Sequence, residues 1–204
     1  GQARASVSRR GANSWALQLR LDFEAQQLVG WVSNDVTGGW VATLQADRLV
    51  FDAHTNPATH YAGKYTVNIP GGTDGNGAVW LGDGYLTLNV DSGGKATCSG
   101  SLADGTFLGP VSVPIGREGY LPLYVPLYQG GGSVWSWLAF GTNEPSANLQ
   151  GWLSWIKPAQ AVAHYPGGLQ SEVLATGARY TPPVGSRSRV IELTNAVVIF
   201  EGGN

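Results

Sequence analysis

Aromatic residues carry the strongest chemical signal in this chain of 204 residues, which holds eight tryptophans and eight tyrosines. The flat apolar face of a sugar ring packs well against an exposed aromatic ring, and neighbouring polar groups then bind the sugar hydroxyls. Trp135 and Trp137 share one face of a predicted strand, because alternate residues of a strand point to the same side. Five residues are candidates for such a carbohydrate platform: Trp80 in a polar loop, and Tyr124, Tyr128, Trp135 and Trp137.

A structural role is the competing interpretation of the tryptophans. Trp31 and Trp152 each follow a glycine in a repeated pattern, which is typical of a large ring that covers a glycine of the paired strand. Trp152 and Trp155 are three residues apart, so we expect them on opposite faces of their strand. Both interpretations stay open from the sequence.

A glycine-rich loop contains a pattern that resembles a calcium site, and His54 and His60 with Asp52 nearby are a second possible metal site. Asp74, Asn76 and Asp83 offer oxygen ligands at spacings similar to those of calcium loops. The spacing and the terminal glutamate of an EF-hand are missing, and an ordinary turn rich in Asp and Asn is the alternative. We therefore predict no cofactor, with calcium at this loop as the exception to test.

Glycoside hydrolysis would need two carboxylates that face each other across a cleft. No sequence context singles out a pair among the available acids, which are Asp22, Glu24, Asp35, Glu118, Glu144 and Glu172. His54, His60 and His164 lie in predicted loops, and the chain has no Gly-x-Ser-x-Gly, phosphate-loop or Cys-x-x-Cys motif. The sequence predicts a protein without catalytic activity, with a glycan-active enzyme as an alternative.

Composition narrows the cellular setting. Charged residues make up 13% of the chain, against roughly 25% in typical domains, and the net charge is -2 without a basic patch, which argues against nucleic acid as a partner. Cys98 is the single cysteine, which excludes an internal disulfide and predicts a buried thiol. The chain has no methionine, so we expect a removed leader or a piece of something longer. Low charge and abundant glycine favour an extracellular or cell-surface protein.

Low charge and many aromatics also fit a barrel that spans a membrane. The predicted strands are short and uneven, however, and their outward faces mix polar with apolar residues. No apolar run reaches the length of a membrane-spanning helix. We therefore predict that the protein does not span a membrane.

The elements that position these residues repeat along the chain. Residues 28–33 (LVGWVS), 98–103 (CSGSLA) and 149–154 (LQGWLS) share one layout: a glycine, one further residue, then Val or Leu and a small residue. Residues 17–22 and 86–91 precede the first two copies, alternate apolar with polar residues, and end in Asp. Such recurrence indicates hairpins of one kind used several times to build a sheet core.

Turn signals and alternation predict roughly twelve strands and an all-β fold. Asp104-Gly105 is the two-residue signal of a tight hairpin, and Pro122 and Pro126 predict an edge or bulged strand because proline lacks a ladder donor. An antiparallel meander hides its edges by closing into a β-barrel, with a two-sheet sandwich as the alternative. We expect one domain over residues 1–204, with residues 71–84 or 143–147 as the place for a boundary.

Several segments resemble a β-rich region of large secreted or surface-anchored bacterial proteins, which often lies near the C-terminus after immunoglobulin-like repeats. The resemblance covers residues 60–204 and rests on 82–106, 122–128, 151–157, 177–183 and 201–204. These are motifs of turns and strands, and the resemblance implies no catalytic residues.

Together these observations predict a non-catalytic, extracellular structural or adhesive β module. A dedicated carbohydrate-binding module is the alternative, and the glycan-active enzyme is a second one. The expected partners are polysaccharide or other surface proteins. Self-assembly, in which one chain adds a strand to the sheet of its neighbour, is a further possibility.

Overall fold

The chain is all-β in the computed structural model, which describes residues 1–9, 11–34, 36–73, 79–80, 82–141, 149–161, 164–185, 195 and 197. A four-stranded antiparallel sheet has the order β1 (Gln2–Arg9), β2 (Ala12–Asp22), β3 (Gln27–Asn34) and β4 (Val41–Asp47). An eight-stranded sheet follows, and β6 (Gly72–Thr73) pairs with β7 (Val79–Trp80) as a small separate ribbon. The described residues form no helix that is long and apolar enough to cross a bilayer.

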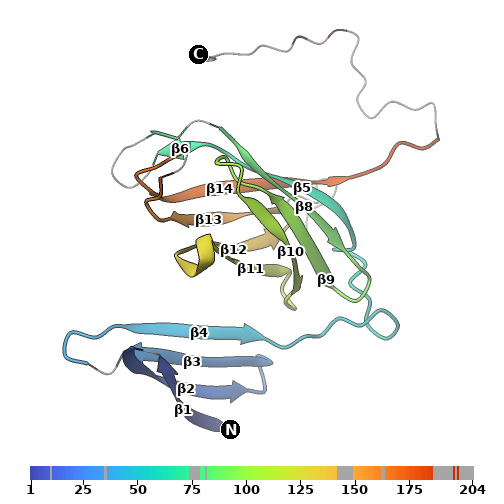
Figure 1. Ribbon diagram of the computed structural model, residues 1–204. Helices are drawn as coiled ribbons and strands as arrows, with labels where there is room; N and C mark the ends of the chain where they lie inside the picture. The colour runs from blue at the N-terminus through green and yellow to red at the C-terminus, as the bar shows by residue number, and fades with distance from the viewer. Residues whose placement is uncertain are drawn as a thin grey trace.

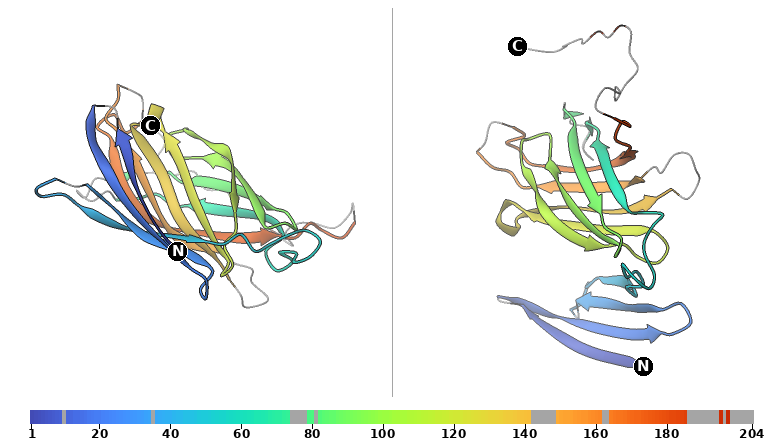
Figure 2. Two further views of the ribbon diagram at one scale, coloured as in Figure 1. Left: turned by 90° about the horizontal axis from the view of Figure 1, so that it is seen from below. Right: turned by 90° about the vertical axis from the view of Figure 1, so that its right-hand side faces the viewer.

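The eight-stranded sheet curls into a nearly closed barrel (Figures 1 and 2). Its strand order is β10 (Phe107–Pro114), β9 (Lys95–Ser101), β8 (Gly84–Val90), β5 (Gly63–Ile69), β14 (Leu169–Tyr180), β13 (Leu149–Lys157), β12 (Gly132–Phe140) and β11 (Tyr120–Leu127). The barrel thus consists of two four-stranded halves that are joined by the pairing of β5 with β14. This arrangement confirms the predicted all-β barrel.

Proline explains why the barrel ends where it does. β11 lies at one edge of the sheet and, among the described strands, pairs only with β12. The missing backbone N–H groups of Pro122 and Pro126 are tolerated at such an edge, and the predicted edge strand is confirmed. β10, at the other edge, contains Pro110 and Pro114, and its register with β9 shifts between Leu108 and Val111. The two edges therefore meet without a continuous hydrogen-bonded ladder between them.

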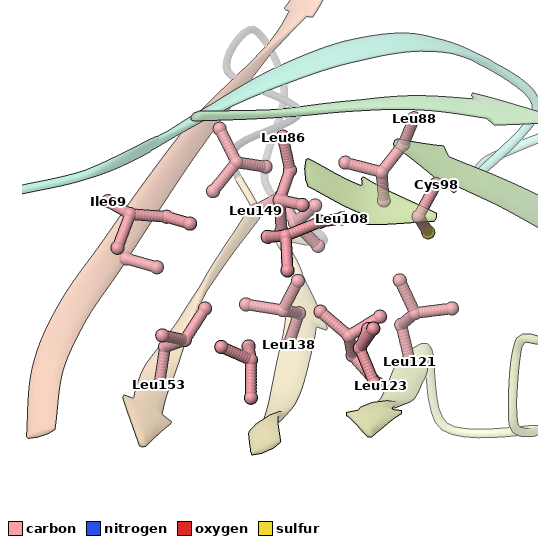
Figure 3. Packing of buried hydrophobic residues seen from close by; sticks show 14 of the residues in the cluster. Ile69, Leu86, Leu88, Cys98, Leu108, Leu121, Leu123, Leu138, Leu149 and Leu153 are labelled. Carbon is pink, nitrogen blue, oxygen red and sulfur yellow. The ribbon is translucent and has the colours of Figure 1, made fainter. Parts of the chain in front are cut away.

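The barrel interior holds the hydrophobic core. Alternate residues of all eight strands point inward, and Figure 3 shows leucines from the two halves facing one another, among them Leu86 and Leu88 opposite Leu121 and Leu138. Cys98 lies in this core and is 2% exposed, as the sequence predicts. The dominant favourable term for the fold is this apolar burial.

The four-stranded sheet has no comparable core. Among the described residues, none before Ala58 is buried. Both figures of the whole chain show this sheet beyond the β11 edge of the barrel, with β4 as its nearest strand (Figures 1 and 2). The two large sheets are separated along the chain by residues 48–62, whereas residues 71–84 come between β5 and β8 of the barrel in the sequence. Residues 143–147 lie outside the described residues.

Aromatic contacts attach the connecting segment to the barrel. The ring of Phe51 meets that of Tyr61 edge-on at 5.6 Å between centroids, and Tyr61 lies 5.3 Å from the ring of Phe140 on β12. The backbone N–H of Ala58 donates to the carbonyl oxygen of Ser92 at 2.8 Å. Residues 48–62 are therefore held on the barrel although they contain little regular structure.

Candidate functional site: an aromatic face on the barrel

Five exposed aromatic side chains gather on the outer side of β11, β12 and β13, and we call this surface the aromatic face. Each of these five aromatic residues is between 43% and 61% exposed. The members of the aromatic face are Tyr120, Tyr124, Trp135, Trp137 and Trp152.

Strand alternation and register bring these residues together. Tyr124 lies directly opposite Trp135, and Pro122 lies opposite Trp137, so β11 and β12 place their outward rings side by side. The ring of Tyr120 meets that of Trp137 edge-on, with centroids 6.4 Å apart. The residues between them point inward and are buried, which fixes the backbone under the aromatic face.

β13 extends the aromatic face because Gly151 allows a close approach to β12. A Cβ at Gly151 would overlap the carbonyl oxygen of Trp137, which lies on the neighbouring strand. Trp152 follows this glycine and points outward, while Trp155 is buried, so the two lie on opposite faces as the sequence predicts. The glycine thus lets β12 and β13 carry Trp137 and Trp152 close to each other.

Polar groups border the aromatic face. Ser154 pairs with Trp135 on one side and with Glu172 of β14 on the other. The Ser154 hydroxyl donates to the Glu172 carboxylate at 3.3 Å, and Glu172 is exposed. Such a site can accept hydrogen bonds from the hydroxyls of a sugar while the sugar ring stacks on the flat aromatic rings beside it.

The two remaining platform candidates are Trp80 and Tyr128. The side chain of Trp80 lies outside the described residues. Tyr128 follows β11 in the short 3-10 helix η1 (Tyr128–Gly130), and its hydroxyl points into a buried polar network. Tyr128 is half-buried there, so its position differs from the exposed one that the sequence suggested.

The possible calcium loop is described only in part. Asp74 and Asn76 lie outside the described residues, and Asp83 accepts a hydrogen bond from the backbone N–H of Gly71 at 2.9 Å. No cluster of three or more potential metal-binding residues occurs within the described part of the chain. Calcium at this loop stays a prediction.

The network around Tyr128 closes one end of the barrel interior. Lys157 of β13 and Asp104 of the β9–β10 turn form an ion pair at 3.2 Å, and their side chains are 2% and 3% exposed. The Tyr128 hydroxyl donates to Asp104 at 2.9 Å and accepts from the indole N–H of Trp155 at 3.0 Å. The backbone N–H of Thr106 also donates to Asp104, at 2.9 Å. The buried charges are therefore paired and hydrogen-bonded.

Burial and hydrogen bonding shift the acidities in this network. Burial raises the pKa of the Asp104 carboxyl, but hydrogen bonds from Thr106, Tyr128 and Lys157 outweigh it and hold that pKa below its ordinary value. Burial also raises the pKa of Tyr128 to about 12. The network thus consists of a carboxylate and a neutral phenol, with the Lys157 ammonium 4.6 Å above the Tyr128 ring.

This buried network was not predicted from the sequence, although one signal for it was present. Lys157 continues the inward-pointing series of Leu153 and Trp155 on β13, and a lysine at a core position requires a buried partner. The sequence pattern places Asp104 only in a hairpin turn and gives no sign of its buried partner. Tyr128 and Tyr165 have positive φ values of 51°, which are strained for bulky side chains, and both occur where the loops close this end of the barrel.

The other acids and the histidines that the structure describes do not converge. Glu24 and Glu118 are exposed and lie in different turns, and Asp35 and Glu144 lie outside the described residues. His54, His60 and His164 are exposed loop residues. Burial raises the pKa of the Cys98 thiol to about 11, which disfavours the reactive thiolate.

Comparisons with known proteins add no relative: no protein-family model matches this chain, and no curated protein is significantly similar to it.

Proposed function

We propose that this chain is a non-catalytic adhesive module of a secreted or surface-anchored bacterial protein, and that its aromatic face contacts carbohydrate. The observation that carries the proposal is the aromatic face itself, with five exposed rings on three adjacent strands. Large apolar patches on a protein surface mark sites of interaction. The low charge of the chain and its resemblance to surface-protein segments support the extracellular setting.

Carbohydrate is favoured over an extended protein partner because polar acceptors lie beside the rings. Glu172 and Ser154 border Trp135, and a sugar ring needs both a flat apolar contact and hydrogen-bonding groups for its hydroxyls. The barrel core beneath the strands keeps the rings in place before a ligand arrives. Preorganised rings of this kind lose little conformational entropy on binding.

The experiment is affinity electrophoresis of the chain through gels that contain soluble polysaccharides, supported by titration of tryptophan fluorescence. We expect at least one polysaccharide to retard the chain, and Trp137→Ala to weaken its binding about tenfold, which corresponds to about 1.4 kcal/mol. Trp31→Ala is the matched control, because Trp31 is similarly exposed but lies on β3 of the other sheet.

Two results would contradict the proposed carbohydrate contact. One is the absence of retardation by any polysaccharide in the panel. The other is an equal loss of binding in Trp137→Ala and Trp31→Ala, which would place the contact outside the aromatic face.

A surface protein is the second candidate partner, favoured by the exposed Leu174 and Ile156 on the same side of β13 and β14.

A further inference from the structure

The four-stranded sheet has one apolar face that no second layer covers in the described part of the chain; only its Trp15 end is covered, by Trp40 and Arg9. Alternate residues of β2 and β3 point to this side, which we call the open face: Trp15, Leu17, Leu19, Leu21, Leu28 and Val32. None of them is buried. Antiparallel sheets commonly pack one face on a core and leave the other to water.

The opposite side of the same sheet carries most of its polar side chains, together with Val29 and Trp31. Arg20 and Asp22 form an ion pair there at 3.2 Å, and Gln27 donates to Asp47 at 2.9 Å. The sheet therefore has one mainly polar and one mainly apolar side, and strand alternation assigns Gln18 and Leu19 to opposite sides. The open face carries apolar residues like those that line a protein core, but no second layer of strands among the described residues packs on it.

The barrel shows what covers an equivalent face. In the β2–β3 pair, Leu19 lies opposite Gly30, and a Cβ on that glycine would overlap the carbonyl oxygen of Gln18. In the β8–β9 pair, Leu86 lies opposite Gly100, and a Cβ there would overlap the carbonyl oxygen of Tyr85. The two pairs share one construction, but in the barrel the face is buried by the other four-stranded half.

The size of the open face suits a stable contact between two copies. Its strands contain 8, 11, 8 and 7 residues. At about 3.3 Å per residue and about 4.8 Å between strands they cover roughly 540 Å², so two copies would bury roughly 1,100 Å². A specific protein interface needs about 1,000 Å² in total.

The open face is also hollowed at one end. A groove of about 500 Å³ lies at the ends of β2, β3 and β4 beside the β2–β3 turn; Leu21, Phe23, Leu28 and Ala46 form its apolar wall, and Asp22, Gln26, Gln27, Asp47 and Arg48 line the rest. Phe23, in the turn, is 73% exposed. The apolar wall of this groove gives side chains of a second layer room to interdigitate with the open face at this end.

We propose that the open face is one half of a second barrel-like core, and that in a preparation of this chain its occupant is the same face of a second copy. The contact is isologous: β1–β4 of one chain packs on β1–β4 of the other around a twofold axis, as the two halves of the barrel pack within one chain. The free edges of β1 and β4 remain outside this contact.

Sedimentation velocity of the full chain across a wide range of concentrations tests the proposal. We expect a dimer of the 21.4 kDa chain. Leu19→Lys should make it monomeric, because a lysine on the open face would be buried without a partner in the dimer. Gln18→Lys is the matched control, because it adds the same charge to the opposite side of the same strand and should leave the dimer intact.

Folding of the variants is checked by circular dichroism, and Leu21→Lys provides a second variant of the open face at a residue that is 45% exposed. A chain that is monomeric at every concentration overturns the proposal. So does a dimer that survives both leucine variants, which would indicate pairing of strand edges. Binding of the monomeric chain to vesicles of zwitterionic lipid would overturn it as well, because the occupant would then be a membrane surface.

Discussion

Replacing Lys157 by methionine should destabilise the barrel by about 3–5 kcal/mol, although methionine is also unbranched and only one heavy atom shorter than lysine. The Lys157 ammonium lies 3.2 Å from the Asp104 carboxylate, and both side chains are almost completely buried. Without the ammonium, Asp104 would keep hydrogen bonds from Thr106 and Tyr128 but would remain a buried charge without a counter-ion. A buried charge without a counter-ion lowers the stability of the folded state, because it has lost its hydration without gaining a partner.

The measurement is urea unfolding at neutral pH, followed by tryptophan fluorescence and by circular dichroism. In a chain of this size, a loss of 3–5 kcal/mol lowers the melting temperature by roughly 6–20 °C. The dependence of the unfolding free energy on urea should keep its slope, because the folded barrel and its buried surface are otherwise retained.

A double-mutant cycle separates the ion pair from the packing. Asp104→Asn alone should also be costly, since it leaves Lys157 buried without its partner. The double variant Asp104→Asn with Lys157→Met should lose clearly less than the two single losses together, because neither charge remains. The reasoning is refuted if Lys157→Met costs less than about 1 kcal/mol, or if the two losses are additive.

Acid titration gives an independent measure of Asp104. The pKa of the Asp104 carboxyl in the folded chain lies below its ordinary value, so the folded state favours the carboxylate. The resulting stabilisation is present above about pH 4 and is lost as the pH falls through the folded-state pKa. Asp104→Asn should therefore flatten the decline of stability in acid. An unchanged acid profile in that variant would contradict the assignment.

Three further outcomes are expected. Gly151→Ala should destabilise the barrel, because its Cβ would meet the Trp137 carbonyl oxygen, whereas Gly167→Ala has open space and should be neutral in thermal unfolding; equal effects would contradict this. Stability should fall as the pH rises from 10 towards 12, because the pKa of Tyr128 is raised to about 12, and Tyr128→Phe should reduce that fall. Cys98 should react with a thiol reagent at neutral pH only after denaturation, and rapid labelling of the folded chain would refute its burial.

The local pattern of the chain was enough to predict individual strands and which side each residue would take. Alternation places Trp135 with Trp137 and separates Trp152 from Trp155, and the prolines of β11 predict an edge, because these properties depend only on backbone geometry within a few residues. Sequential hairpins such as β8 with β9 and β9 with β10 follow from their turns for the same reason.

The tertiary structure decided which distant strands became neighbours. The pairing of β5 with β14 joins segments about a hundred residues apart, and no local pattern specifies that partner. The same closure places Tyr128 over Lys157 and Asp104 from three separate elements, so the buried network could not be read from any one of them. Whether an apolar strand face is buried depends on a second layer that lies elsewhere. The similar patterns of β2–β3 and β8–β9 therefore lead to an open face in one sheet and to a closed core in the other.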